Sequence, residues 1–191
     1  DECYSEIYRH TPPLGLMEIS DKLGADPNRV VTFHSLSKRS NLPGLRSGFA
    51  ASGEKNIKQM KQLRAYSGAP IPEPLQHVSA SVWNDENHVI KNREIYKKKY
   101  KFADQIFDDF DGYLSPEAGF FLWLDVGNGE KTAVELWQNC GVRVLPGRYL
   151  AKDSKGQSPG DRFIRIAMVS ELEETKDGLN KIREFLRKTE E

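Results

Sequence analysis

The sequence is poor in cysteine and contains no long hydrophobic run. Its 191 residues include two cysteines, Cys3 and Cys140, which lie too far apart for a metal-binding motif and are too few for a disulfide scaffold. This cysteine usage fits a reducing, cytoplasmic compartment. No apolar stretch reaches the roughly 20 residues of a membrane-spanning helix, and no signal peptide opens the sequence. We therefore expect no membrane partner.

The sequence also lacks an excess of either charge. Basic and acidic residues number 28 each, so the formal net charge is zero. A balanced charge gives no support to a nucleic-acid partner. His10, His77 and His88 are too scattered for a metal site, so we expect no metal. His34 lies at a predicted strand end, where we expect no catalytic role.

The pattern of apolar residues predicts alternating strands and helices, which is typical of an α/β fold. The chain is long enough to bury a core without disulfides. Predicted strands cover residues 30–33, 48–51, 119–126, 141–145 and 163–169, and predicted helices cover residues 14–23, 54–66, 75–83, 87–110, 132–140 and 172–188.

The helix predicted at about residues 87–110 divides the chain. At roughly 36 Å it is long enough to join two domains. We expect a partial large domain over residues 1–95 and a small C-terminal α/β domain over residues 96–191. The basic run at residues 97–99 is interpreted as a solvated helix face. Thr132 is predicted to cap the next helix, with Glu135 completing a capping box.

The first residues read as the end of a strand that enters a loop, and we expect the chain to begin inside a larger protein. Together with the helix at 14–23 and the strand at 30–33, they predict a βαβ unit, whose strands run parallel. Parallel strands bring their carboxyl ends to one edge, where open α/β sheets bind ligands. Residues 1–4 and 35–38 are therefore expected at the same edge.

The stretch from residue 34 to residue 49 contains the largest group of candidate functional side chains. Ser35, Ser37, Lys38 and Arg46 surround a Pro-Gly turn. Hydroxyls and a guanidinium can hold a phosphate, and a lysine amine can condense with an aldehyde. This set suits a phosphorylated, carbonyl-bearing cofactor. The alternative interpretation is a basic surface turn after a buried strand.

Arg165 interrupts an apolar predicted strand. Burying an arginine is costly unless it is paired. One interpretation is an edge-strand arginine that reaches solvent. The other is a guanidinium that faces a cleft and binds a carboxylate through two hydrogen bonds.

In order and spacing these residues resemble the C-terminal half of a class I/II aminotransferase, an enzyme of the pyridoxal-phosphate (PLP)-dependent fold type I. The family pattern is Asp-x-x-Tyr, Ser-x-Ser-Lys, Pro-Gly-x-Arg-x-Gly and a late-strand arginine. The matching residues here are Asp1 and Tyr4, residues 35–38, residues 43–48 and Arg165. The run SLSKRSNLPGLRSGF is also similar to the succinyldiaminopimelate transaminases of bacterial lysine biosynthesis. The expected fold is therefore a fragment of the fold-type-I large domain followed by the small domain.

The resemblance implies a role for each cofactor-binding residue. Lys38 is expected to form a Schiff base with the PLP aldehyde and to transfer the proton during catalysis. Asp1 would pair with the pyridine nitrogen, and Tyr4 would donate its hydroxyl to the ring phenolate oxygen. Ser35 and Arg46 would hold the phosphate, with Ser37 as a further candidate.

The resemblance also implies substrates and partners. Arg165 would bind the α-carboxylate of the amino acid and of the 2-oxo acid. Glutamate is the expected amino donor, and N-succinyl-amino-oxopimelate follows from the subgroup as acceptor. The parent protein is expected to be a homodimer. The missing N-terminal half would supply the rest of the PLP site, so we expect this fragment to be inactive alone and to expose apolar surface.

Two alternatives remain at this point. The same residues serve other fold-type-I enzymes, such as a PLP-dependent C–S lyase. They would also serve the non-catalytic, PLP-binding sensor half of a transcription regulator.

Overall fold

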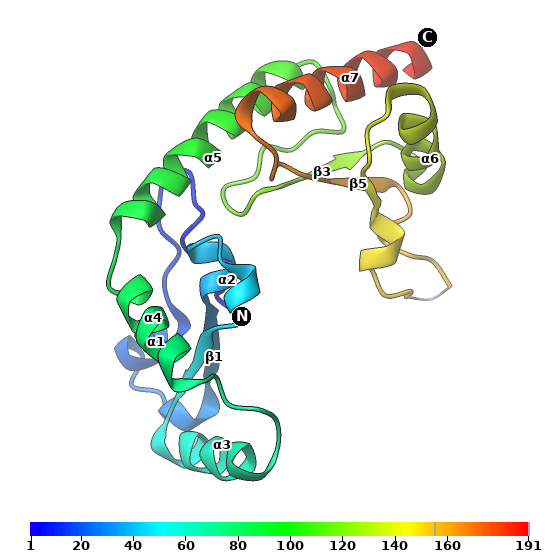
Figure 1. Ribbon diagram of the computed structural model, residues 1–191. Coiled ribbons are helices and arrows are strands. Elements are labelled where there is room, and N and C mark those ends of the chain that lie inside the picture. The colour runs from blue at the N-terminus through cyan, green and yellow to red at the C-terminus, as the bar shows by residue number, and fades with distance from the viewer. Residues whose placement is uncertain (155, 191) are drawn as a thin grey trace. The chain divides into compact units, whose positions relative to one another are not determined.

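The computed structural model describes residues 1–154 and 156–190 (Figure 1). The chain divides into two compact units, Asp1–Arg93 and Glu94–Glu191. Helix α5 (Asn87–Ile106) contributes residues to both. In the described residues, no helix combines the length and apolar character that crossing a membrane requires.

The first unit is built around a two-stranded antiparallel sheet. Strand β1 (Val31–Ser35) pairs with β2 (Gly48–Ser52), and the register runs from Val31 opposite Ser52 to Ser35 opposite Gly48. The other elements are α1 (Leu16–Lys22), η1 (Pro27–Arg29), α2 (Leu36–Arg39), η2 (Pro43–Leu45), α3 (Glu54–Tyr66) and α4 (Glu73–Trp83). The helix predicted at residues 54–66 is therefore confirmed with its bounds.

The prediction of a βαβ unit at the start of the chain is wrong. Residues 3–6 form a turn, and the only described partner of β1 in its sheet is the antiparallel β2. The Asp1 carboxylate accepts a hydrogen bond from the Cys3 amide at 3.0 Å. Such a local side-chain bond favours a turn over a strand ladder. The first residues nevertheless lie beside β1, because the Glu2 amide donates to the Phe33 carbonyl at 2.9 Å.

The second unit is a three-stranded antiparallel sheet covered by helices. Its elements are β3 (Phe121–Asp125), α6 (Gly129–Cys140), β4 (Leu145–Pro146), η3 (Gly147–Leu150), β5 (Phe163–Ala167) and α7 (Leu172–Glu190). The strand order is β3-β5-β4. One sheet face packs against α5, α6 and α7 through a core that includes Tyr100, Phe107, Leu122, Leu124, Leu136, Ile164, Ile166, Leu179 and Ile182.

Two helix ends in this unit differ from the prediction. Helix α5 ends at Ile106, four residues before the predicted end, because the chain then turns and the Phe110 amide donates to the Phe107 carbonyl. Helix α6 is capped by Asn128, whose side chain accepts from the Lys131 amide at 3.0 Å, and not by Thr132. Thr132 is buried within the helix.

The interpretation of residues 97–99 as a solvated face is wrong for Lys99. Its side chain is buried, and its ammonium donates to the carbonyls of Met168 (2.8 Å) and Ser170. Burial lowers the pKa of Lys99. Lys99 therefore holds α5 against the end of β5.

Asp109 links the turn after α5 to α7, and this link predicts an effect of pH. Hydrogen bonds from Arg183 (2.9 Å) and Arg187 (2.7 Å) lower the pKa of Asp109 from 3.8 to about 2. Its stabilising contribution is therefore complete above the unfolded pKa near 3.8 and is lost as the pH falls through about 2. We expect Asp109→Asn to unfold at lower urea concentration at pH 6 and to converge with wild type near pH 2.

The matched control is Asp108→Asn, because Asp108 is the exposed neighbour of Asp109 on the same turn. The measurement is urea unfolding followed by circular dichroism between pH 2 and pH 6. A constant difference between Asp109→Asn and wild type over this range would contradict the assignment.

Candidate functional site

The end of β1 passes directly into the helix that carries Lys38. Ser35 is the last residue of β1 and the N-cap of α2, since its Oγ accepts from the Ser37 amide at 3.1 Å. The same Oγ lies 2.8 Å from Ser37 Oγ and 3.2 Å from the Ser47 carbonyl oxygen. Leu36 is fully buried and fixes the first residue of α2. Lys38, half-buried, follows within this single helical turn.

The Pro-Gly turn, which includes Pro43 and Gly44, returns the chain to the end of β1. Arg46 adopts a left-handed backbone conformation (φ 54°), and its guanidinium donates to the Pro43 carbonyl at 3.0 Å. The Leu36 amide then donates to the Ser47 carbonyl at 3.1 Å, and Gly48 lies opposite Ser35. The structure thus brings Arg46 to the strand end that carries Ser35, Ser37 and Lys38.

A Glu2–His34 pair holds the opening residues at this strand. The Glu2 carboxylate contacts His34 Nε2 at 3.0 Å and accepts from the Leu16 amide at 2.8 Å. Asp1 and Tyr4 are exposed. The opening segment, with Asp1 and Tyr4, therefore lies beside the residues that precede Ser35. The sequence patterns singled out neither Glu2 nor His34 for this contact, and only the general capacity of a carboxylate to pair with an imidazole could have indicated it.

Arg165 belongs to the second unit. It lies on β5, the middle strand, so the interpretation as an edge-strand arginine is wrong. The buried Ile164 and Ile166 flank it, which places its side chain on the sheet face opposite the core. Its guanidinium lies 4.2 Å from the centre of the Phe121 ring. Its Nε is buried and makes no hydrogen bond with the residues that the structure describes.

The two aromatic residues of β3, Phe121 and Trp123, lie on the sheet face opposite the core, because the core residues Leu122 and Leu124 alternate with them. Trp123 lies directly across from Arg165, and its indole stacks on Phe163 with ring centres 5.6 Å apart. It remains 36% exposed, whereas Phe120 and Leu122 are buried. Phe120, which precedes β3, therefore belongs to the buried residues, and Trp123 does not.

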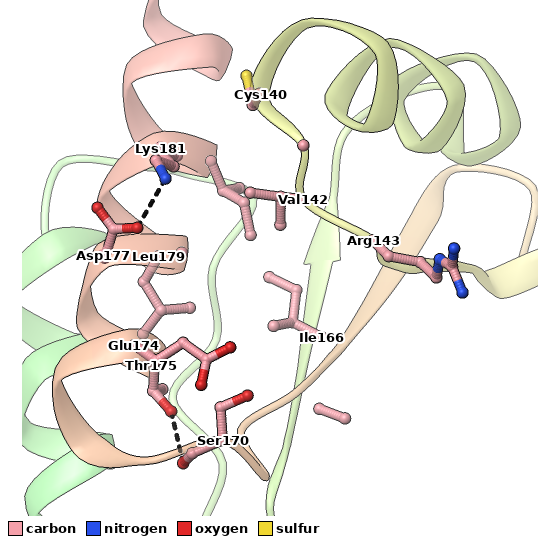
Figure 2. A pocket seen from close by; sticks show the side chains of 14 residues that line it. Cys140, Val142, Arg143, Ile166, Ser170, Glu174, Thr175, Asp177, Leu179 and Lys181 are labelled. Atoms are coloured by element: carbon pink, nitrogen blue, oxygen red, sulfur yellow. Dashed lines mark hydrogen bonds and ion pairs between the residues drawn. The ribbon is translucent and has the colours of Figure 1, made fainter.

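A cavity of about 370 Å³ lies elsewhere in the second unit, among α6, α7 and β5 (Figure 2). Its walls carry an ion pair between Lys181 and Asp177 (2.7 Å) and a hydrogen bond from Thr175 to the Ser170 carbonyl (3.0 Å). None of the residues predicted for the site lines it. Within the described ranges, no group of three His, Cys, Asp or Glu residues could hold a metal.

The donor set of the first unit fits a phosphorylated ligand. Two hydroxyls 2.8 Å apart and the exposed Arg46 guanidinium surround one strand end. Guanidinium and hydroxyl donors match the acceptors of a phosphate. Lys38, three residues after Ser35, adds an amine that can react with a carbonyl.

Comparison with known proteins decides the family. Residues 1–182 match the family described as aminotransferase class I and II. The chain belongs to this family. Class I and II aminotransferases depend on pyridoxal 5′-phosphate, the phosphorylated aldehyde that the donor set fits.

Individual relatives agree with this assignment. A crystal structure of an aminotransferase from Neisseria meningitidis Z2491 is 39% identical with a TM-score of 0.93, covering 98% of this chain and 48% of that chain. OxyQ of Streptomyces rimosus, a 4-dedimethylamino-4-oxo-anhydrotetracycline transaminase, is 29% identical over 89% of this chain and 46% of its own length. An LL-diaminopimelate aminotransferase of Dehalococcoides mccartyi is 26% identical over 81% and 40%, respectively. The chain thus spans less than half the length of these relatives.

The two glycines of the aminotransferase Pro-Gly-x-Arg-x-Gly motif provide a matched test of this turn. A Cβ at Gly48 would lie 2.4 Å from the His34 carbonyl oxygen, whereas a Cβ at Gly44 would meet nothing within 4 Å. We expect Gly48→Ala to destabilise the protein by about 1–3 kcal/mol, as overpacking does. Gly44→Ala should change stability little. Thermal unfolding of both variants checks this, and equal melting temperatures would contradict the role of Gly48.

Proposed function

We propose that this chain is the C-terminal half of a PLP-dependent aminotransferase that moves an amino group between an amino acid and a 2-oxo acid. The observation that carries the proposal is Lys38 on the turn capped by Ser35, beside Arg46, within a family match over residues 1–182. The first unit then belongs to the large, PLP-binding domain, and the second is the small domain.

Three residues are assigned to the reacting end of the site. Bound PLP supplies a ring that accepts the electron pair left when the α-proton of the amino acid is removed. Lys38 removes that proton and returns it, which requires its amine in the neutral form. Asp1 keeps the pyridine nitrogen protonated, and Tyr4 donates its hydroxyl to the phenolate oxygen.

The remaining residues bind and orient the cofactor and the substrates. Ser35, Ser37 and Arg46 hold the phosphate through two hydroxyls and one guanidinium. Arg165 binds the α-carboxylate of both substrates, since a forked contact uses Nε together with one terminal nitrogen. The buried Nε with no described hydrogen-bond partner supports this assignment.

The substrate proposal is narrower. We propose glutamate as amino donor and N-succinyl-amino-oxopimelate as acceptor, which places the enzyme in lysine biosynthesis. Its support is the run SLSKRSNLPGLRSGF and the similarity to an enzyme named for LL-diaminopimelate. The reaction would take place in the cytoplasm.

We also propose that the complete enzyme is a homodimer and that its N-terminal half covers the first unit. Large apolar side chains of this unit are exposed, among them Phe33 on β1, Phe49 on β2 and Leu63 and Tyr66 on α3. Exposed apolar surface of this kind marks an interaction face. The isolated chain would therefore be inactive.

Replacement of Lys38 tests the central assignment. We expect Lys38→Ala in a full-length protein to lower kcat by at least about 10³-fold, within the range that general acid–base catalysis supplies. Borohydride reduction followed by mass spectrometry should locate PLP on Lys38 in wild type and on no lysine in the variant. Lys58→Ala, at an exposed position of α3, is the control. Unchanged PLP labelling of Lys38→Ala would refute the assignment.

Replacement of Arg165 tests the proposed binding of the substrate α-carboxylate. We expect Arg165→Ala to lower kcat/KM for carboxylated donors by about 10²-fold, because two charge-assisted hydrogen bonds are worth about 3 kcal/mol. Arg165→Lys should recover only part of this, since an ammonium lacks the forked geometry. Arg162→Ala is the matched control, because Arg162 precedes β5, is largely exposed and pairs with Asp125 at 2.9 Å. Steady-state kinetics with a panel of amino donors measures the effect. An unchanged kcat/KM for every donor would rule out this role.

A further inference from the structure

The residue after Lys38 is a buried arginine to which the proposed reaction gives no role. Arg39, in a helix of four residues, is 6% exposed as a whole residue, whereas its neighbours Lys38 and Ser40 are half-buried. Its guanidinium donates to the carbonyls of Val82 and Trp83, each at 3.3 Å, and forms an ion pair with Glu86. It also stacks over the Trp83 ring, 5.0 Å from the ring centre. A buried arginine in so many contacts is strongly constrained in position.

These contacts lie at the end of one helix and the start of the next. Val82 and Trp83 are the last residues of α4, where main-chain carbonyls carry the negative end of the helix dipole; the Val82 carbonyl also accepts from the Asp85 amide at 3.3 Å. Glu86 immediately precedes α5. Arg39 therefore connects α2 to the junction of two longer helices by donating to the last two carbonyls of α4 and pairing with the carboxylate that precedes α5.

A second contact fixes the next residue at the same junction. Ser40, the C-cap of α2, has its Oγ 2.8 Å from His88 Nε2. The other ring nitrogen, His88 Nδ1, lies 2.9 Å from the Asp85 carboxylate. Arg39 and Ser40 together thus hold the C-terminal end of α2, while Ser35 and Leu36 hold its start.

A helix of four residues has no stability of its own, because helix formation is cooperative with a costly nucleus. The direction of the Lys38 side chain consequently depends on the anchors at the two ends of α2. We propose that Arg39, supported by Ser40 and His88, is a positioning residue that fixes Lys38 for proton transfer by tying α2 to the α4–α5 junction. This inference rests on the proposed function of Lys38.

The test compares Arg39→Gln with Arg183→Gln in a full-length protein. Arg183 is a suitable control because its side chain is equally buried (6% exposed, against 7% for Arg39) and is paired with a carboxylate, Asp109, in the second unit. A misplacement of about 1 Å at a reacting group costs about 10²-fold in rate. We therefore expect Arg39→Gln to lower kcat about 100-fold with little change in KM, and Arg183→Gln to keep kcat within about 3-fold. Arg39→Lys should recover part of the loss.

Hydrogen exchange supplies a measurement that does not depend on activity. The amides of Ser40 and Leu42 donate to the Leu36 carbonyl at 3.1 and 3.3 Å and report on α2. We expect Arg39→Gln to lose protection at these two amides while β1 and β2 keep theirs. Should Arg39→Gln fail to fold, Ser40→Ala is judged by the same rate and exchange measurements; this variant removes the Ser40 contacts with His88 (2.8 Å) and with the Arg39 guanidinium (3.4 Å) but keeps the Arg39 contacts with α4 and Glu86.

Each outcome decides the proposal. Local loss of protection with a fall in kcat supports it. An unchanged kcat overturns it, and so does equal loss of protection across α2, β1 and β2, which would indicate support of the whole unit. If wild type binds no PLP at Lys38, the proposed function fails, and exchange at Ser40 and Leu42 still shows whether Arg39 orders α2.

Discussion

The pairing of Ser35 with Gly48 is the constraint on which the first unit depends. At this position one strand ends, a helical turn begins and the returning strand starts. The Ser35 hydroxyl caps α2, so it cannot move without releasing the turn that carries Lys38. Gly48 lies so close to the His34 carbonyl that a side chain would separate the strands. The spacing of the motif in sequence therefore matches a hairpin of β1 and β2 whose connection carries Lys38.

Buried cations that bind main-chain carbonyls recur in both units. Arg39 satisfies the end of α4, and Lys99 satisfies the carbonyls of Met168 and Ser170 after β5. Each joins a helix to a segment distant in sequence. Carbonyls at helix ends and strand ends have capacity for a further hydrogen bond, and a long basic side chain can reach them while its stem packs against apolar groups. A basic run in the sequence does not reveal which member turns inward, which is why Lys99 was predicted to be solvated.

Helices and strands were predicted correctly from the sequence where a local residue pattern determines them. The predictions failed where contacts between residues distant in sequence determine the structure. Helix α3 follows from its own periodicity, and its bounds match. The βαβ prediction failed because the opening residues were interpreted as the end of a strand. In the structure they form a turn, and the Asp1 carboxylate accepts a hydrogen bond from the Cys3 amide within it. The cap of α6 was misplaced because Asn128 competes with Thr132, and only packing shows that Thr132 is buried. Motif spacing predicted which side chains gather at the end of β1, whereas the Glu2–His34 pair has no local signature.

Arg165 shows how the second unit places a charged side chain on a middle strand. A middle strand has no edge, so the half-buried Arg165 side chain lies on the sheet face opposite the core. The Phe121 ring compensates the charge partly, but a ring face provides no acceptor in the plane of the Nε donor. Leaving a buried donor without an acceptor destabilises the unit. A planar carboxylate removes this cost, because it accepts from Nε and a terminal nitrogen together. Among the described residues, the Arg165 Nε thus keeps the capacity to donate to a planar acceptor such as a carboxylate.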